Sequence, residues 1–244
     1  LQWPSKAARA NLAPAPDDSH SALAWDAGLG ALVSAPLANG VRVGLQLGVL
    51  ELIVTHEGKT DLLTLEGCTP HTVDDWLDLK LRAQKLKAAS AARLPYQVAP
   101  RELKNEPGLA ALARWFAAAA EVLEEVRARH AVLRPSAVVC WPHHFDIALV
   151  LPLGPGAAGL ACSIGVGVSP GDQYYAQPYA YVSPYPAPKA PQPPALPPGG
   201  HWHTKDFFGA VATAEALLGE RDPRAALLAV IEAAFEAGRS CLDR

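Results

Sequence analysis

The longest uncharged stretch of the chain covers residues 147–171 and reads IALVLPLGPGAAGLACSIGVGVSPG. Its 25 residues would suffice to cross a membrane as a helix. The middle of the stretch, residues 152–159, instead has the glycine and proline content of a turn. Apolar residues on both sides of a turn predict two buried strands with a connection between them. We therefore expect a globular protein whose core includes these two strands, and we expect no interaction with a membrane.

Further strands and helices are predicted on either side of this pair. Short apolar runs joined by short connections predict an antiparallel meander over residues 20–66. Helical periodicity predicts three main helices, and Asp222 with Pro223 has the pattern of a helix start. Since strands and helices occur in blocks, we expect a single α+β domain over residues 1–244, with division into 1–94 and 95–244 as the alternative. The predicted helices are 72–88, 106–130 and 223–241, and the later strands are 96–99, 137–141, 144–151, 160–168 and 175–182.

Composition excludes several classes of function. Half of the residues are apolar and 18% are charged, which is typical of a globular protein. The net charge is −3 and no cluster of Lys and Arg stands out, so a nucleic-acid partner is not expected. The four cysteines are scattered without metal-ligand or disulfide spacing, which favours a cytoplasmic protein. The oligomeric state is left open.

Histidines cluster at two places in the C-terminal half, and the first cluster includes an aspartate. If residues 144–151 form a strand, His144 and Asp146 share the face opposite Phe145. His201 and His203 are also two residues apart and can point the same way. Together they have the ligand types of a two-histidine, one-carboxylate site for a divalent metal, zinc or iron. The candidate metal ligands, and equally the candidate acid–base side chains, are His144, Asp146, His201 and His203.

Two other interpretations of these histidines stay open. One is a buried His–Asp hydrogen bond that braces the sheet, and the other is a polar binding site without metal. A proline-rich segment over residues 184–198, with eight prolines, predicts a stiff surface arm that carries the second cluster. We expect this arm to bring His201 or His203 close to His144 or Asp146.

Five of the six tyrosines lie between residues 174 and 185. Tyr179 and Tyr181 alternate with small residues and so share one face of the last predicted strand. Such rings either pack in a core with satisfied hydroxyls or form a platform for a sugar ring, a peptide or an aromatic ligand. The candidate ligand-binding residues are His143, Tyr174, Tyr175, Tyr179, Tyr181 and Trp202.

Two reactive side chains are assigned structural roles. Residues 167–171 match the letters of a nucleophile elbow around Ser169, but the next residue, Pro170, lacks the N–H that an oxyanion hole would use. These residues, with Asp172, are expected to form a turn between strands. Cys140 lies at a predicted strand end and is expected to be a buried structural thiol.

Several short motifs resemble an uncharacterised bacterial family, a domain of unknown function. They are the Phe-Asp strand at Phe145, the Ser-Pro-Gly turn at Ser169, the Tyr-Ala-Tyr strand at Tyr179 and the Asp-Pro helix at Asp222. The resemblance implies the fold and no reaction. Two functions follow from the residues themselves: a metal-dependent or acid–base enzyme acting on a small molecule in a His/Asp/Tyr-lined pocket, or a non-catalytic binding module that uses a Tyr/Trp surface.

Overall fold

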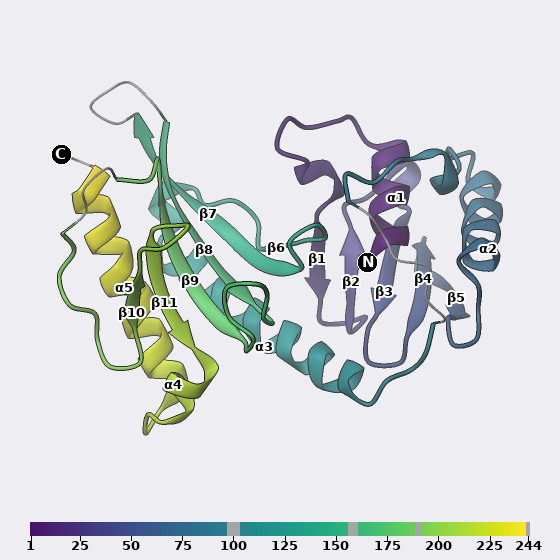
Figure 1. Ribbon diagram of the computed structural model, residues 1–244. Helices are drawn as coiled ribbons and strands as arrows, with labels where there is room; N and C mark the ends of the chain where they lie inside the picture. The colour runs from purple at the N-terminus through teal and green to yellow at the C-terminus, as the bar shows by residue number, and fades with distance from the viewer. Residues whose placement is uncertain (97–102, 156–160, 189–191, 243–244) are drawn as a thin grey trace. The chain divides into compact units, whose positions relative to one another are not determined.

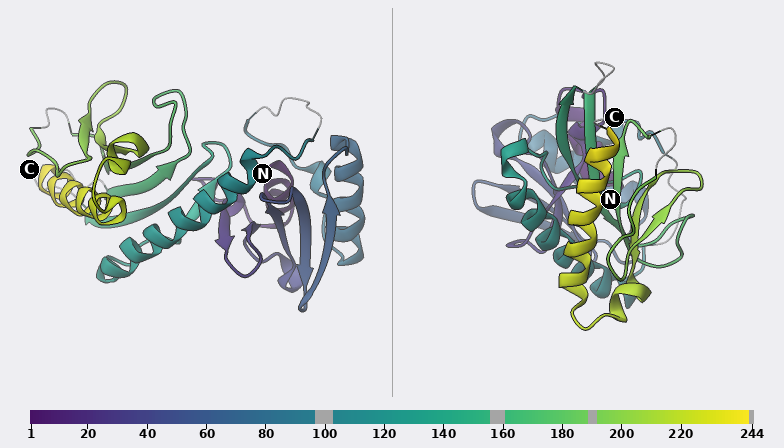
Figure 2. Two further views of the ribbon diagram at one scale, coloured as in Figure 1. Left: turned by 90° about the horizontal axis from the view of Figure 1, so that it is seen from below. Right: turned by 90° about the vertical axis from the view of Figure 1, so that its left-hand side faces the viewer.

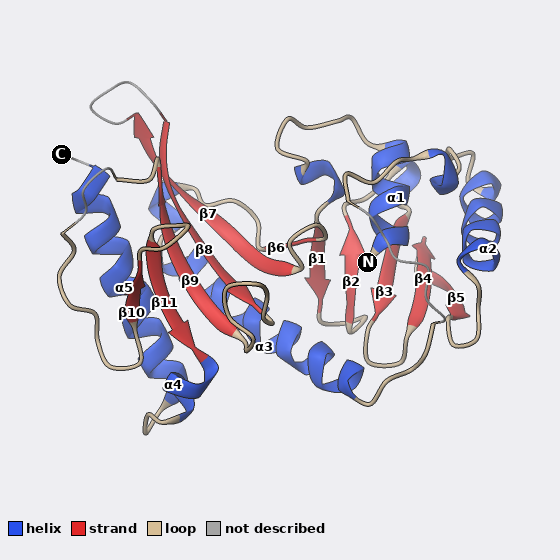
Figure 3. Cartoon of the chain, in the orientation of Figure 1, coloured by secondary structure: helices blue, strands red, loops and turns tan. Residues whose placement is uncertain are grey.

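The chain folds into two compact units, shown in a computed structural model that describes residues 1–96, 103–155, 161–188 and 192–242 (Figure 1). The first unit contains Leu1–Ala118 and Val139–Phe145, and the second contains Ala119–Val138 and Asp146–Arg244. Both combine antiparallel strands with helices (Figure 3), so the α+β class is confirmed. The chain passes from one unit to the other inside one helix, after Val138 and after Phe145. The single domain expected from the sequence, with residue 94 as its alternative division, stays a prediction.

The first unit is an antiparallel sheet with strand order β6-β1-β2-β3-β4-β5. Its meander of β2 to β5 matches the expectation from the alternating apolar residues. The elements are α1 (Gln2–Asn11), η1 (Ser19–Ser21), β1 (Leu23–Asp26), β2 (Ala31–Ser34), η2 (Ala38–Gly40), β3 (Arg42–Gln46), β4 (Glu51–His56), β5 (Lys59–Thr64), α2 (Pro70–Ala83), η3 (Ala89–Ala91), the first half of α3 (Gly108–Arg129) and β6 (Val139–Trp141).

Helix α1 is an addition to the three main helices expected from the sequence. Its Trp3 side chain is 3% exposed, and Nε1 of Trp3 donates a hydrogen bond of 3.0 Å to Asp74 of α2. Lys6 forms an ion pair of 3.1 Å with the same carboxylate. The described chain therefore has four helices of ten or more residues, and the expectation of three was wrong. An element of three turns has too short an apolar stripe to stand out in the sequence.

The second unit is an antiparallel sheet with strand order β7-β8-β9-β11-β10. Strands β7 and β8 come from the uncharged stretch, so its interpretation as two strands is confirmed. Among the described residues no helix is long and apolar enough to cross a membrane. The elements are the second half of α3, η4 (Ala131–Leu133), β7 (Asp146–Pro155), β8 (Ala161–Ser169), β9 (Tyr179–Tyr185), β10 (His201–His203), β11 (Gly209–Thr213), α4 (Ala214–Leu218) and α5 (Pro223–Leu242).

Helix α5 covers one face of this second sheet (Figure 2). It begins as expected, because Oδ1 of Asp222 accepts a hydrogen bond of 3.0 Å from the backbone N–H of Ala225 and Pro223 is the first helical residue. Gly238 of α5 lies against Ile164 of β8 and Pro184 of β9. The face that carries Ile164 and Pro184 is therefore the covered one, and the alternate residues of each strand lie on the opposite face.

The second half of α3 packs beside α5 through paired charges. Glu125 of α3 contacts both Arg129 of its own helix and Arg224 of α5. His130, just after α3, lies 3.0 Å from a carboxylate oxygen of Glu232. A hollow of about 430 Å³ is lined by the ion-paired side chains of Glu125, Arg129, Arg224 and Glu232. Because these side chains are paired with one another, we assign this hollow to helix packing and place the candidate site on the sheet.

Two of the predicted strands, at residues 96–99 and 175–182, remain to be compared with the structure. The expected strand at 96–99 lies largely outside the described residues. Tyr175 precedes β9, in a loop, although the sequence placed it in the strand. This loop is the segment that builds the candidate site.

Candidate functional site

A row of tyrosine and histidine side chains lies on the face of the second sheet opposite α5. Tyr181 of β9 pairs with Gly167 of β8 and with Val211 of β11, and Val211 pairs with His201 of β10. Residues paired in this way share one face. The alternate positions Tyr179 and His203 belong to it as well. We call this surface the tyrosine face.

The hydroxyl oxygen of Tyr175 joins the two histidines of β10. It lies 3.0 Å from Nε2 of His201 and 2.8 Å from Nδ1 of His203. The prediction that both imidazoles of the His-Trp-His segment point the same way is therefore confirmed. The sequence did not indicate their partner, because Tyr175 reaches them from a loop.

One assignment of ring protons to neutral imidazoles satisfies all of these hydrogen bonds. Nε2 of His203 lies against the backbone carbonyl of Lys205, which only accepts, so this nitrogen carries a proton. Nδ1 of His203 then accepts from the Tyr175 hydroxyl, whose oxygen in turn accepts from Nε2 of His201. Nδ1 of His201 is thus a lone-pair acceptor with no partner among the described residues. Burial lowers the pKa of His201, with a further contribution from His203.

Asp172 holds the loop that carries Tyr175. Its Oδ1 accepts from the backbone N–H groups of Tyr174, at 2.8 Å, and Tyr175, at 3.2 Å. Its Oδ2 accepts from the Tyr179 hydroxyl at 2.7 Å. Burial and this carboxylate raise the pKa of Tyr179. The sequence placed Asp172 in the turn after Ser169, where an aspartate commonly organises loop backbone, but it did not indicate the contact with Tyr179.

Tyr181 forms the other end of the row and reaches Asp146 at the start of β7. Its hydroxyl donates a hydrogen bond to the Asp146 carboxylate, which is 8% exposed. Burial, and then the negative charge of Asp146, raise the pKa of Tyr181 well above its usual value. To reach Asp146 the ring crosses β8 over Gly167. A Cβ atom added at Gly167 would lie 2.4 Å from the Tyr181 ring, so only glycine leaves space for it.

Each ring of this row packs against the next one. The centroid of Tyr175 lies 6.0 Å from that of His201, 5.6 Å from that of His203 and 4.8 Å from that of Tyr179. The centroids of Tyr179 and Tyr181 are 6.2 Å apart. Tyr179 is 5% exposed. The expectation of packed tyrosines with satisfied hydroxyls is confirmed for Tyr179, and the row connects the histidines to Asp146 through ring contacts.

His144 does not occupy the position expected for it. Residues 142–145 form a turn, Phe145 has φ of 61°, and β7 begins at Asp146, so the strand alternation does not extend to His144. The alternation holds further along, where Ile147, Leu149 and Leu151 are at most 1% exposed. His144 belongs to the first unit and Asp146 to the second. A site that His144 shares with His201 or His203 stays a prediction.

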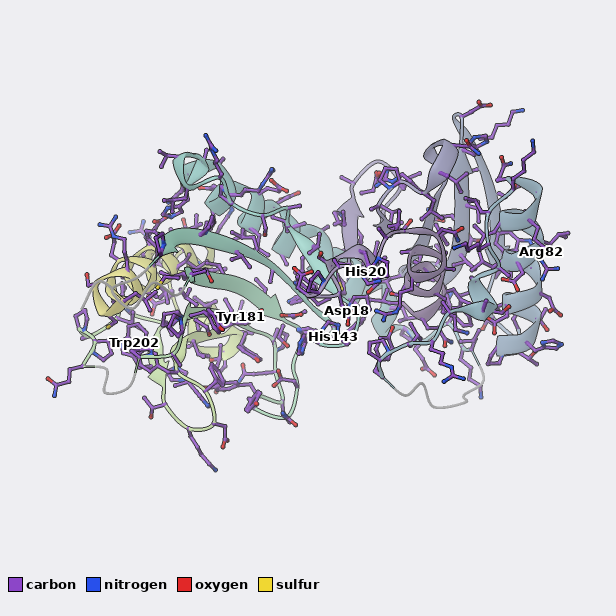
Figure 4. The ribbon with its side chains drawn as sticks, turned by 90° about the horizontal axis from the view of Figure 1, so that it is seen from above. Asp18, His20, Arg82, His143, Tyr181 and Trp202 are labelled. Carbon is purple, nitrogen blue, oxygen red and sulfur yellow. The ribbon has the colours of Figure 1, made fainter. Side chains whose placement is uncertain are left out.

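His143 lies in the same exposed turn, 4.2 Å from His144 between ring centroids. It also lies near Asp18 and His20 of the first unit (Figure 4). The Arg9 guanidinium, and to a smaller extent His20 and His143, hold the pKa of Asp18 below its usual value. Two members of the expected set thus lie in this turn of the first unit, whereas Asp146, His201 and His203 belong to the second.

Trp202 points away from the tyrosine face. Its ring stacks on Phe208, with 5.2 Å between centroids, and its Nε1 donates a hydrogen bond of 2.8 Å to the backbone carbonyl of Pro194 in the proline-rich segment. It therefore anchors β10 on the side opposite the two imidazoles. Tyr174 is 40% exposed and lies near His203, at 6.1 Å between ring centroids.

The remaining reactive residues have the structural roles assigned to them. Oγ of Ser169 accepts a hydrogen bond of 3.2 Å from the backbone N–H of Gly171, which closes the expected turn. Cys140 is fully buried. In the described parts of the chain, no three residues of the types His, Cys, Asp and Glu are placed to hold one metal ion.

Comparisons of the chain with family models, curated proteins and solved structures find no match. The resemblance to a bacterial family of unknown function therefore stays a prediction.

Proposed function

We propose that the tyrosine face binds a small polar ligand whose ring has an apolar face, such as a sugar. The observation that carries this proposal is an open block of sheet beside the row of rings. In this block Gly165 pairs with Val150 and Ser183, and Ser163 pairs with Tyr185. Tyr185 is 67% exposed and Val150 is 39% exposed.

This block of sheet provides both open space and hydrogen-bonding groups for a ligand. A Cβ atom added at Gly165 would meet a single neighbouring atom within 4 Å, the Ser183 carbonyl oxygen at 3.8 Å, so the space above this backbone is open. The hydroxyls of Ser163 and Ser183 lie on the same side and can both donate and accept. Aromatic rings near such hydroxyls suit a ring that is apolar on its face and polar at its edge.

The hydrogen bonds of the row favour binding over catalysis. The hydroxyls of Tyr175, Tyr179 and Tyr181 are already bonded within the protein, which holds their rings in place before a ligand arrives. The exposed rings of Tyr174 and Tyr185 remain for contact with a ligand. An acid–base enzyme that pairs His144 with Asp146 is the weaker proposal, because His144 lies in an exposed turn and not on β7.

Ligand-observed NMR with a panel of monosaccharides, disaccharides and aromatic acids tests this proposal. Tyr185→Ala should weaken the affinity of a binding sugar about two- to thirteenfold, since one aromatic contact contributes about 0.5–1.5 kcal/mol. Tyr174→Ala should have a similar effect if the ligand extends toward His203. Trp76→Ala, which removes a partly exposed ring from the first unit, is the control and should leave the affinity unchanged.

The proposal is contradicted if no member of the panel binds, or if binding survives both tyrosine substitutions. Loss of binding in Trp76→Ala alone would move the site to the first unit.

A further inference from the structure

The three atoms that meet at the edge of the tyrosine face are all metal-ligand types. Nε2 of His201 and Nδ1 of His203 both lie against the hydroxyl oxygen of Tyr175. The two imidazoles come from one strand and the phenol from a loop that Asp172 holds in place. This convergence involves tyrosine, so it differs from the groups of His, Cys, Asp and Glu that are lacking among the described residues.

The separations suit a shared ion. Two ligands that each bind a metal at about 2.0–2.1 Å lie about 2.8–3.4 Å apart in octahedral or tetrahedral geometry. The oxygen of Tyr175 is 3.0 Å from one nitrogen and 2.8 Å from the other. Small outward shifts of the phenol and the imidazoles would therefore admit an ion at the point where they meet.

A second observation supports the same conclusion. Histidines that bind metals usually donate their other ring N–H to a carboxylate, a backbone carbonyl or water. Nε2 of His203 lies against the backbone carbonyl of Lys205, which leaves Nδ1 as the nitrogen with a lone pair. The contact orients this lone pair toward Tyr175.

We propose that His201, His203 and Tyr175 form a site for one divalent transition metal, bound through Nε2, Nδ1 and the phenolate oxygen. Imidazole and phenolate ligands suit Cu²⁺ and Zn²⁺. On binding, the Tyr175 hydroxyl loses its proton to solvent, and the proton on Nε2 of His201 moves to Nδ1 through solvent, so one proton is released per ion. Three protein ligands leave coordination positions open for water or another small molecule. The site does not depend on the sugar-binding proposal.

Metal titration of protein prepared without a histidine tag and treated with a chelator tests the site. Zn²⁺ should bind in a one-to-one ratio by calorimetry, and His201→Ala and His203→Ala should each weaken binding at least about 100-fold. Cu²⁺ should produce a visible phenolate-to-copper charge-transfer band. Tyr175→Phe keeps the ring, and so its packing, but should abolish this band and weaken Zn²⁺ binding at least about tenfold.

The exposed His143–His144 pair provides the matched control. Its rings are 4.2 Å apart, so it could bind a metal adventitiously. The double variant His143→Ala/His144→Ala should keep the one-to-one Zn²⁺ binding and the copper band. Loss of binding in this control, or an unchanged band in Tyr175→Phe, would overturn the proposal. Absence of Zn²⁺ binding by the folded wild-type protein, with its circular dichroism intact, would assign the three residues a purely structural role.

Discussion

Gly167→Ala should destabilise the protein by about 2.5–6 kcal/mol, because overpacking costs about 1–3 kcal/mol and a lost hydrogen bond to a charged group adds about 1.5–3 kcal/mol. The added methyl carbon would lie 2.4 Å from both Cζ and the hydroxyl oxygen of Tyr181 and 2.7 Å from Cε1. The ring would have to leave its position over β8. It cannot shift without breaking its hydrogen bond to Asp146 or its contact with Tyr179. Urea unfolding measures the change.

Gly165→Ala is the matched control for this prediction. The two glycines lie two residues apart on β8 and share a face, but a methyl group at Gly165 meets its nearest neighbour at 3.8 Å. We expect a change within about 1 kcal/mol, since alanine also restricts the unfolded chain. In a Tyr181→Ala background, Gly167→Ala should lose most of its effect, because the clashing ring is absent. Equal destabilisation by the two glycine substitutions would show that the ring does not lie over Gly167.

The fold was largely predictable because its strongest signals are local. The uncharged stretch gives β7 and β8, and Asp222 with Pro223 begins α5 as expected. The error at His144 is also local. The Trp141-Pro142 segment leads into a turn, and the positive φ of Phe145 ends any strand alternation before Asp146. The alternation of side chains between the two faces of a sheet applies only to residues within the strand, and His144 precedes it.

The candidate site was predictable only in part. The spacing of His201 and His203 was sufficient to place both imidazoles on one face of a strand. Their shared partner, Tyr175, was expected on a strand but lies in a loop, and Asp172 acts through backbone contacts that depend on the folded loop. The pairing of Tyr181 with Asp146 spans 35 residues of sequence and requires a glycine on the strand between them. A contact that depends on three residues from three different strands leaves no periodic pattern in a single sequence.

The contact between Tyr181 and Asp146 predicts a change in stability at alkaline pH. The pKa of Tyr181 is raised well above its usual value in the folded protein, mainly by burial and then by the charge of Asp146. Unfolded tyrosine ionises near pH 10. Above about pH 10 the folded state thus binds more protons than the unfolded state, and the free energy of unfolding should fall by about 1.4 kcal/mol per pH unit from this residue alone. Below about pH 10 its contribution is fully present.

Tyr181→Phe separates this effect from other alkaline ionisations. Near neutral pH the variant should be about 1.5–3 kcal/mol less stable than the wild type, because the Asp146 carboxylate loses a donor. As pH rises above about 10, the wild type loses stability through Tyr181 and the variant does not, so the two curves of unfolding free energy against pH should converge. Tyr185→Phe, which removes a hydroxyl from a side chain that is 67% exposed, should follow the wild-type curve. Curves for Tyr181→Phe and wild type that stay parallel between about pH 8 and 11 would mean that Tyr181 ionises as readily in the folded protein as in the unfolded chain.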